Sequence, residues 1–491
     1  MLFIILLTVL SSVLLYIILK PNNYWKKRNV LQVGDIMYKF MISKLSMPEI
    51  CRAICDKHEV EAIGTSTGTV QTLLLKNTQD IQAVLTGEFQ KFHSRGFLIN
   101  PNDILANNLL FINDFQKWKI IRQKLTPVFT SARLKNMFYI MDRCARDFVD
   151  LVDDNQHLKK KPYTLVYTYT TAAIGASVFG IDTQAKSTMN SPYVAMMWKA
   201  LTPTLKANLI LLTANVFPDL YKLFKLRTLG DYEKQFIGIM KTVMESRKHD
   251  TQKRHDFIEI CLELKKQGLL KDTTSGYELE PSDEMLAAQA FFFFAAGADT
   301  SATVMHFALT ELASNPDILA RLHKEIDEVF EANKTDEITY DDLDKLQYLD
   351  MIISESMRKY PPVGILQRIC TRDSVVLPSG VTVEKDVVCI IPVMAIQRNE
   401  KNYPDPEVFD PERFAPENVS NIKKYTYLPF GEGNRHCLGG RFSRVQIKVG
   451  MARLLRRFTL TPQKLQPIAF EKSAFGLRAA DIFYDLKLRD F

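Results

Sequence analysis

The chain has 491 residues, of which 46% are hydrophobic and 24% are charged, and its formal net charge is +7. A nucleic-acid-binding protein would concentrate its basic residues in one stripe, whereas these are scattered, so we expect no nucleic-acid partner. Seven cysteines at irregular spacings argue against a disulfide framework, and no second pair joins Cys51 and Cys55 in a zinc site. No linker or repeat divides the sequence, which favours one large, mostly helical domain whose core can enclose a cofactor.

The first segment, Leu2 to Leu19, is uncharged and rich in Leu, Ile and Val. Its length reaches the lower end of a membrane span, and it lacks the basic leader of a cleaved signal peptide. The basic run Lys26–Arg28 would keep the following chain on the cytoplasmic side of the membrane. The alternative is a buried core helix. We expect a membrane anchor at 1–20, a basic linker at 21–30 and a cytosolic domain at 31–491.

Apolar residues at helical spacing mark much of the first half of the chain. Pro127 interrupts this pattern within 114–141, and two prolines divide the apolar stretch 201–220 into short helices or a loop. Amphipathic helices are expected within 140–180 and 230–270.

A long helix should begin at the cap residue Ser282 and end at Asn315, because Pro316 stops it. It would be about 48 Å long. Its residues are apolar nearly all round between Met285 and Ala298, so it should cross the middle of the domain. Few strands among many helices predict a mainly α fold with a small β part. The later elements are expected as a helix at 346–360, strands at 374–377 and 381–383, a coil at 398–425 and a helix at 439–458.

The segment Phe430–Gly439 carries the strongest chemical signal. Its two internal glycines permit a tight turn and the close approach of a flat ligand. Cys437 stands at the entry to a helix, whose amide N–H groups favour a thiolate, and Arg435 can offer a cation to an anionic group. A dinucleotide-binding loop is excluded because His436 occupies the third glycine position and no strand precedes it. Taken alone, such a cysteine is more often a buried structural thiol.

The complete loop resembles the haem-binding loop of the cytochrome P-450 family, and the resemblance extends over nearly the whole chain after the predicted anchor. It implies one haem domain with the fold of that family. Haem b would be the cofactor, with Cys437 as the thiolate ligand of its iron and Phe430 among its contacts. Arg368 and Arg435 would hold the haem propionates, with Arg95 as a further candidate.

The segment Ala296–Ser301 lies midway along the long helix and supports the same resemblance. Polar residues inside an apolar helix are costly unless function requires them. The Thr300 hydroxyl can bond to the Ala296 carbonyl, and Gly297 would leave room above a haem face. The resemblance makes Thr300 and Asp299 the oxygen-binding and proton-delivery pair, and Ala296 and Gly297 haem contacts. Outside this pattern, a threonine in mid-helix is usually bonded to its own backbone.

Two further pairs have the spacing that places both residues on one helical face. Trp118 and Arg122 could direct the indole N–H and the guanidinium toward a propionate, or could be a core residue beside a surface residue. Glu355 and Arg358 could be a solvated surface pair, but the resemblance makes them a buried structural network with Arg413.

The chain also departs from the family pattern. Gln397 stands where many relatives have histidine, and Asn434 and His436 are unusual in the haem loop. The proline-rich hinge that usually follows the anchor is absent, since only Pro21 and Pro48 occur before residue 100. We expect these differences to tune the site.

The family resemblance implies a monooxygenase. The chain has no flavin or nicotinamide motif, so electrons should come from NADPH through the cytochrome P-450 reductase of the endoplasmic reticulum membrane, with cytochrome b5 as a second candidate donor. Part of a basic set could form the docking face for this acidic flavoprotein, or could be an ordinary solvated surface. The set comprises Lys117, Lys119, Lys124, Arg441, Arg444 and Lys448.

The segments expected to line the substrate pocket are apolar, so the substrate should be lipophilic. One or two of the aromatic residues at 291–294 should face this pocket. The other expected walls are 97–99, 201–220, 363–366 and 475–477. The overall pattern resembles insect microsomal members that oxidise xenobiotics such as plant toxins and insecticides. Three alternatives are hormone or lipid oxidation, a haem-thiolate isomerase or dehydratase, and a non-catalytic carrier.

Overall fold

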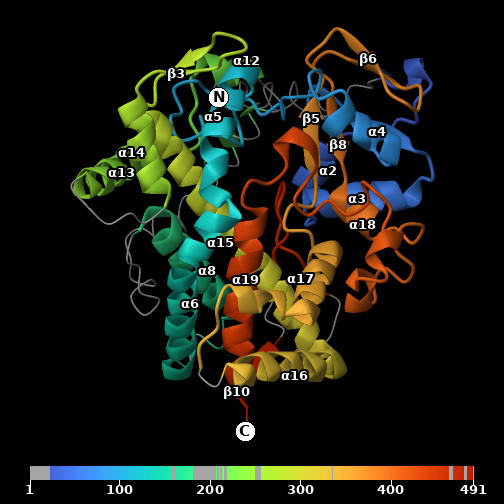
Figure 1. Ribbon diagram of the computed structural model, residues 1–491. Helices are drawn as coiled ribbons and strands as arrows, with labels where there is room; N and C mark the ends of the chain where they lie inside the picture. The colour runs from blue at the N-terminus through green and yellow to red at the C-terminus, as the bar shows by residue number, and fades with distance from the viewer. Residues whose placement is uncertain are drawn as a thin grey trace, which may run out of the picture.

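The computed structural model is shown in Figure 1. It describes residues 23–155, 159, 161–180, 206, 209–210, 213–214, 218–248, 256–333, 336–463, 468–479 and 484–489. The predicted anchor and most of the expected wall segment 201–220 lie outside these ranges. Within them, no helix combines the length and the apolarity that a membrane crossing requires.

The described chain is mostly helical, as predicted. The helices of the first half are α2 (Ile36–Ile42), α3 (Met47–Lys57), α4 (Thr78–Gln82), α5 (Phe115–Leu125), α6 (Ser131–Asp154), α8 (Pro162–Phe179), α12 (Pro218–Leu223), α13 (Glu233–Arg247) and α14 (Phe257–Gln267). Those of the second half are α15 (Asp283–Ser314), α16 (Pro316–Ala332), α17 (Gln347–Lys359), α18 (Val393–Gln397) and α19 (Gly440–Arg457). The break predicted at Pro127 is confirmed as a 3-10 turn between α5 and α6.

Among the described residues, ten short strands form the β part. The largest sheet has the order β1-β2-β8-β5, and its strands are β1 (Ala62–Thr67), β2 (Val70–Leu75), β8 (Val388–Ile391) and β5 (Leu366–Ile369). Strand β8 runs parallel to β2 and antiparallel to β5, so Arg368 of β5 pairs with Cys389. The remaining strands pair as β3 (Leu270–Lys271) with β4 (Glu278–Leu279), β6 (Ser374–Val376) with β7 (Thr382–Glu384), and β9 (Phe458–Pro462) with β10 (Tyr484–Leu488).

The long helix α15 has the bounds that the sequence predicted. The Ser282 side chain accepts a hydrogen bond from the Met285 N–H, and the helix ends before Asn315. Its central position is also confirmed, because it packs against α8, α13, α17 and α19. Figure 1 shows α6, α8, α13, α14, α15 and α19 at the left and centre of the molecule and α16 and α17 in its lower part. Strands β5 and β8 of the four-stranded sheet lie at the upper right, beside α2, α3, α4 and α18.

Helix α8 differs from the amphipathic helix expected there. Every residue from Leu165 to Val178 is buried, because α8 contacts α15, α6, α14 and α19. A helix enclosed on all sides needs no polar face.

The segment expected as a basic linker at 21–30 packs against the sheet where the structure describes it. Trp25 is fully buried, and its indole N–H donates to the Thr65 carbonyl oxygen at 3.0 Å. A Cβ atom on Gly64 would lie 2.1 Å from Trp25 Cγ, so this contact requires glycine. Arg28 forms an ion pair with Glu384 of β7.

Candidate active site

The loop that precedes α19 is a compact turn. The Gly431 N–H donates to the Leu428 carbonyl oxygen at 3.0 Å, and the Cys437 N–H donates to the Phe430 carbonyl oxygen at 2.7 Å. Gly431 and Gly433 have φ angles of 66° and 73°, in the region that favours glycine. The loop therefore has the tight turn that its glycines predicted.

Cys437 is the one exposed cysteine, whereas the other six are buried, and none of the seven forms a disulfide. Its thiol is nevertheless surrounded by protein, and this desolvation raises its pKa. The Gly439 N–H, Arg122 and Arg95 oppose that effect. The predicted influence of the helix N-terminus is therefore present, but burial outweighs it. An accessible thiol enclosed by protein atoms lies in a hollow of the molecule.

Four arginines from distant segments surround this hollow. The Arg435 guanidinium lies 4.5 Å from the centre of the Trp118 ring and donates to the Ile112 carbonyl oxygen at 2.8 Å. The Arg122 guanidinium donates to the His436 carbonyl oxygen at 2.9 Å. The Arg95 guanidinium donates to the carbonyl oxygens of Leu110, at 2.8 Å, and Arg435, at 3.1 Å.

These arginines lack anionic partners. Within the described chain, Arg95, Arg122, Arg368 and Arg435 form no ion pair with a carboxylate. Buried Nε and Nη1 of Arg435 and buried Nε of Arg368 have no hydrogen-bond partner. Burial lowers the pKa of Arg368 to about 10, and burial with repulsion from Arg368 and Arg122 lowers that of Arg435 to about 9.

Buried donors without partners are costly, so this cluster requires a ligand with anionic groups. Two haem propionates beside a cysteine ligand fit that donor set. No group of three or more His, Cys, Asp or Glu side chains that could hold a metal ion occurs among the described residues. The structure thus brings together Trp118, Arg122, Arg368, Arg435 and Cys437, and their roles toward a haem stay predictions.

Helix α15 packs against α19, the helix that follows the Cys437 loop. From Leu286 to Ala313 it is buried except for six half-buried residues, which are Phe292, Ala295, Ala296, Gly297, Asp299 and Thr300. Phe292, Ala296 and Thr300, with Ala295 and Asp299 beside them, recur every three to four residues and form one stripe of the helix, whereas Gly297 faces α8. The predicted bond from the Thr300 hydroxyl to the Ala296 carbonyl oxygen is confirmed at 2.6 Å.

Asp299 has two partners that the sequence did not reveal. The Tyr163 hydroxyl donates to Asp299 Oδ1 at 2.7 Å, and Arg478 forms an ion pair with the same oxygen. Burial opposes the charge of Arg478, but Tyr163, Asp299 and Glu471 outweigh that effect and raise its pKa. Arg478 directly follows the expected wall segment 475–477, but no local pattern places it opposite a residue 179 positions earlier.

Two glycines of the site are required by close packing within the protein. A Cβ atom on Gly297 would lie 2.6 Å from Ile174 Cδ1, so the absence of a side chain at Gly297 lets α8 approach. A Cβ atom on Gly433 would lie 2.1 Å from the Leu85 carbonyl oxygen, so this glycine allows two backbones to approach. The expectation that these glycines also make room for a flat ligand stays a prediction, as does contact of Gly297 with haem.

The aromatic residues at 291–294 have different surroundings in the structure. Phe291 packs edge-on against Phe236, and Phe293 packs against Phe129 and Phe257. Phe292 is the half-buried member of the run and shares its helical face with Ala296 and Thr300.

Three of the expected pocket walls meet in space. The Phe97 and Phe475 rings pack edge to face, with 5.4 Å between their centres. The backbone of Val363 pairs with that of Gly476, and the Gly364 N–H donates to the Phe475 carbonyl oxygen at 2.9 Å.

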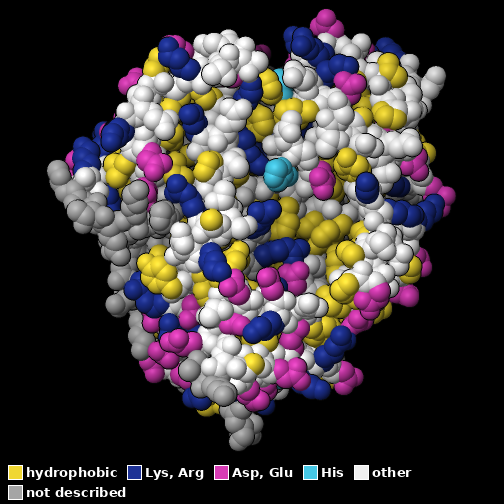
Figure 2. Space-filling model, viewed as in Figure 1, with side chains coloured by type: hydrophobic (Ala, Val, Ile, Leu, Met, Phe, Trp, Pro, Cys, Tyr) yellow, Lys and Arg dark blue, Asp and Glu magenta, His cyan; other side chains and the backbone are white. Residues whose placement is uncertain are grey.

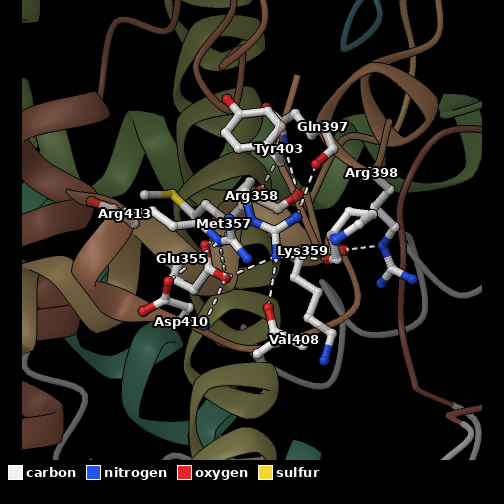
Figure 3. Close-up of polar contacts among 12 residues, drawn as sticks. Glu355, Met357, Arg358, Lys359, Gln397, Arg398, Tyr403, Val408, Asp410 and Arg413 are labelled. Atoms are coloured by element: carbon white, nitrogen blue, oxygen red, sulfur yellow. Dashed lines mark hydrogen bonds and ion pairs between the residues drawn. The ribbon is translucent and has the colours of Figure 1, made fainter. Parts of the chain in front are cut away.

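The expected network at Glu355 is buried, as predicted. Glu355 and Arg358 are fully buried and form a bidentate ion pair, with Nε–Oε2 at 2.7 Å and Nη2–Oε1 at 2.8 Å. Arg413 Nε lies 3.6 Å from Glu355 Oε1. In Figure 3 the Arg358 guanidinium lies between Glu355 and Gln397, whose carbonyl oxygen accepts from Arg358 Nη1 at 2.9 Å.

Three of the six basic residues expected at a docking face form ion pairs within the protein. Figure 2 shows Lys and Arg side chains along the middle of one face, over α5 and the start of α19, above a row of acidic side chains. Lys119 is paired with Asp272, and Arg444 and Lys448 with Asp350. Of the set, Lys117, Lys124 and Arg441 have no carboxylate in an ion pair within the described chain.

Comparison with known proteins agrees with this geometry. The cytochrome P450 family model matches residues 46–485. Cytochrome P450 6B2 of Helicoverpa armigera is 33% identical over 93% of this chain and 92% of that protein. Cytochrome P450 6a2 of Drosophila melanogaster is 31% identical over 96% and 97% of the two chains, and cytochrome P450 6k1 of Blattella germanica is 30% identical over 96% and 93%. The chain therefore belongs to the cytochrome P450 family, close to insect members, and is a cytochrome P450 monooxygenase.

Proposed function

We propose that this enzyme inserts one oxygen atom of O₂ into lipophilic xenobiotics, such as plant toxins or insecticides, at the endoplasmic reticulum membrane. The observation that carries the proposal is the group of four arginines beside the one exposed cysteine, which have no anionic partner among the residues that the structure describes. A structural thiol would not need such a setting, whereas a bound haem with two propionates would satisfy it.

Each residue of the hollow then has a distinct task. Haem ligated by a thiolate supplies dioxygen activation when it is bound. Cys437 would hold the iron, and Arg95, Arg122, Arg368 and Arg435 would hold the propionates. The Trp118 ring under the Arg435 guanidinium fixes the orientation of that cation.

The α15 stripe would manage protons and water. Thr300 holds its hydroxyl on the Ala296 carbonyl oxygen, and Asp299 beside it forms an ion pair with Arg478. A carboxylate next to a hydroxyl can pass a proton from solvent into the hollow. Phe292 on the same stripe would exclude bulk water from the substrate side.

Electrons would come from NADPH through a partner reductase, with cytochrome b5 as a second donor. Lys117, Lys124 and Arg441 would contribute the basic docking charges, because the other members of the predicted set are paired internally. The apolar run at Leu2–Leu19 supports placement of the enzyme in the same membrane as that reductase.

The substrate class rests on the apolar walls. Phe97, Phe292 and Phe475 offer aromatic surface, which binds lipophilic compounds. The likeness to insect relatives favours xenobiotics over hormones or lipids. The Asp299–Thr300 pair disfavours a haem-thiolate isomerase, since peroxide rearrangement needs no proton delivery to dioxygen.

The test is reconstitution of the full-length haem protein with NADPH and the reductase. We expect the ferrous–CO absorption typical of thiolate-ligated haem, and its loss in Cys437→Ala. We also expect NADPH-dependent oxygenated products from a panel of plant toxins and insecticides. Persistence of the absorption in Cys437→Ala would refute the ligand assignment. Product formation without NADPH or reductase would favour an isomerase, and haem binding without turnover a carrier.

A further inference from the structure

We infer that Gln397 is a positioning residue that fixes the Cys437 loop to the end of helix α17. The inference rests on the proposed function, because it gives this loop the task of ligating a haem iron. Gln397 is the last residue of α18 and is fully buried. Its carboxamide lies between two segments that are adjacent in space and far apart in sequence.

The carboxamide uses all of its hydrogen-bonding groups. Its Nε2 donates to the carbonyl oxygens of Met357 and Arg358, both at 2.9 Å. Its Oε1 accepts from the Leu428 N–H at 2.7 Å. Figure 3 shows Gln397 beside Met357 and Arg358, next to the ion-pair network.

The two carbonyls belong to the last turn of α17, which ends at Lys359. Carbonyls in the last turn of a helix have no partner within the helix and need one elsewhere. Gln397 supplies that partner and at the same time holds the first backbone N–H of the approach to the Cys437 loop.

A chain of hydrogen bonds continues from Leu428 to the thiol. The Leu428 carbonyl oxygen accepts from the Gly431 N–H, which closes the turn, and the Phe430 carbonyl oxygen accepts from the Cys437 N–H. A second tie precedes it, since the Tyr427 hydroxyl donates to the Ser354 carbonyl oxygen of α17 at 3.0 Å. Displacement of Leu428 would therefore move the residues that orient Cys437.

No other side chain of similar size offers the same three bonds. A neutral imidazole has one donor and one acceptor, and a carboxylate has acceptors alone. Histidine at this position would lose one bond, and glutamate would direct its oxygens at two carbonyl oxygens. The identity of residue 397 thus determines how firmly the loop is attached.

Gln289 of α15 provides a matched control. It is also fully buried, its Nε2 donates to the carbonyl oxygens of Asn107 and Met285, and its Oε1 accepts from the Leu109 N–H at 2.8 Å. None of its three partners lies in the segment 428–439 that carries Cys437, whereas Leu428, a partner of Gln397, does. Substitution at either glutamine removes the same chemistry, so a difference between them isolates the effect of position.

The experiment compares Gln397→His, Gln397→Glu, Gln289→His and Gln289→Glu in the full-length haem protein. The rate at which the ferrous–CO complex loses its thiolate-type absorption is measured, together with the thermal unfolding midpoint by circular dichroism. We expect Gln397→Glu, which loses both bonds to the α17 carbonyl oxygens, to lose the thiolate signature about thirtyfold faster than the unsubstituted protein, the effect of about 2 kcal/mol. Gln397→His should show a smaller acceleration, and both Gln289 variants the unsubstituted rate, with similar midpoints at the two positions.

Equal rates in the Gln397 and Gln289 variants would overturn the inference and leave the proposed function intact. If Gln397→Glu does not fold, Gln397→His decides, because it keeps one donor and one acceptor. Absence of the thiolate signature in the unsubstituted protein would instead refute the proposed function, and the inference with it.

Discussion

Two arginines, Arg358 and Arg435, are almost equally buried and have opposite surroundings. Arg358 uses all three nitrogens, on Glu355, on the Gln397 carbonyl oxygen and on the Pro406 carbonyl oxygen. Arg435 makes one hydrogen bond and leaves two nitrogens without a partner. The Arg358 guanidinium completes a network within the protein, whereas the Arg435 guanidinium has unused donors that an anionic ligand could accept from.

The contrast separates a structural region from a binding region. A buried charge whose bonds are all made within the chain is part of the fold, and its removal leaves the partner unpaired. A buried charge with unused donors costs the fold free energy that a ligand can return on binding. The predictions below test this difference, from the largest expected effect to the smallest.

Replacing Glu355 with Gln should lower the free energy of unfolding by about 3–5 kcal/mol, because Arg358 would remain buried without its counter-ion. The yield of folded protein and its denaturant midpoint measure this effect. Glu412→Gln is the control, since Glu412 and its partner Arg321 are 43% and 56% exposed, and it should cost at most about 1 kcal/mol. Equal losses in the two variants would contradict the assignment of Glu355 to the structural region.

The ion pair of Arg478 with Asp299 lies between the two extremes, with side chains 21% and 29% exposed. Asp299→Asn should lower the rate of product formation about 100-fold, because a proton-transfer group is lost. The rate of product formation is measured, together with the peroxide released per NADPH consumed. Asp327→Asn, which removes the carboxylate partner of Arg489, should leave both quantities unchanged. An unchanged rate of product formation in Asp299→Asn would exclude this residue from proton delivery.

Replacing Arg435 with Leu should weaken haem retention by about 2 kcal/mol, or about thirtyfold, since a propionate would lose a charged partner. The haem-free chain should keep its stability, because a buried charge with unused donors is removed. Haem transfer to an acceptor protein measures retention. Arg456→Leu is the control. Arg456 lies on α19, the helix that follows the Cys437 loop, and pairs with Asp327, so its replacement should leave haem retention unchanged. Loss of the haem-free fold would place Arg435 in the structural region instead.

Reversing an outer charge should have the smallest effect. Lys124→Glu should slow reductase-driven turnover about threefold at low salt, and the difference should vanish at high salt as the charges are screened. Lys324→Glu, a reversal on α16, is the control and should leave turnover unchanged. A salt-independent effect, or none, would exclude Lys124 from the docking face.

Local features of the site could be predicted from the sequence. The Ser282 cap, the stop before Pro316 and the bond from Thr300 to the Ala296 carbonyl oxygen each join residues within one helical turn. Such contacts follow from the helix geometry that the residues adopt, whatever surrounds them. The turn of the Phe430–Gly439 loop could also be predicted, because the Cys437 N–H donates to the Phe430 carbonyl oxygen of the same loop.

Contacts between distant segments were decided by the tertiary structure alone. Arg478 meets Asp299, Lys119 meets Asp272, and Gly297 admits Ile174 because helices and hairpins pack in one arrangement. No local preference encodes which element lies opposite another, since that depends on how the whole core is filled. The sequence by itself determined the chemical groups of the site, and the packing of the fold determined which of them are paired and which remain open to a ligand.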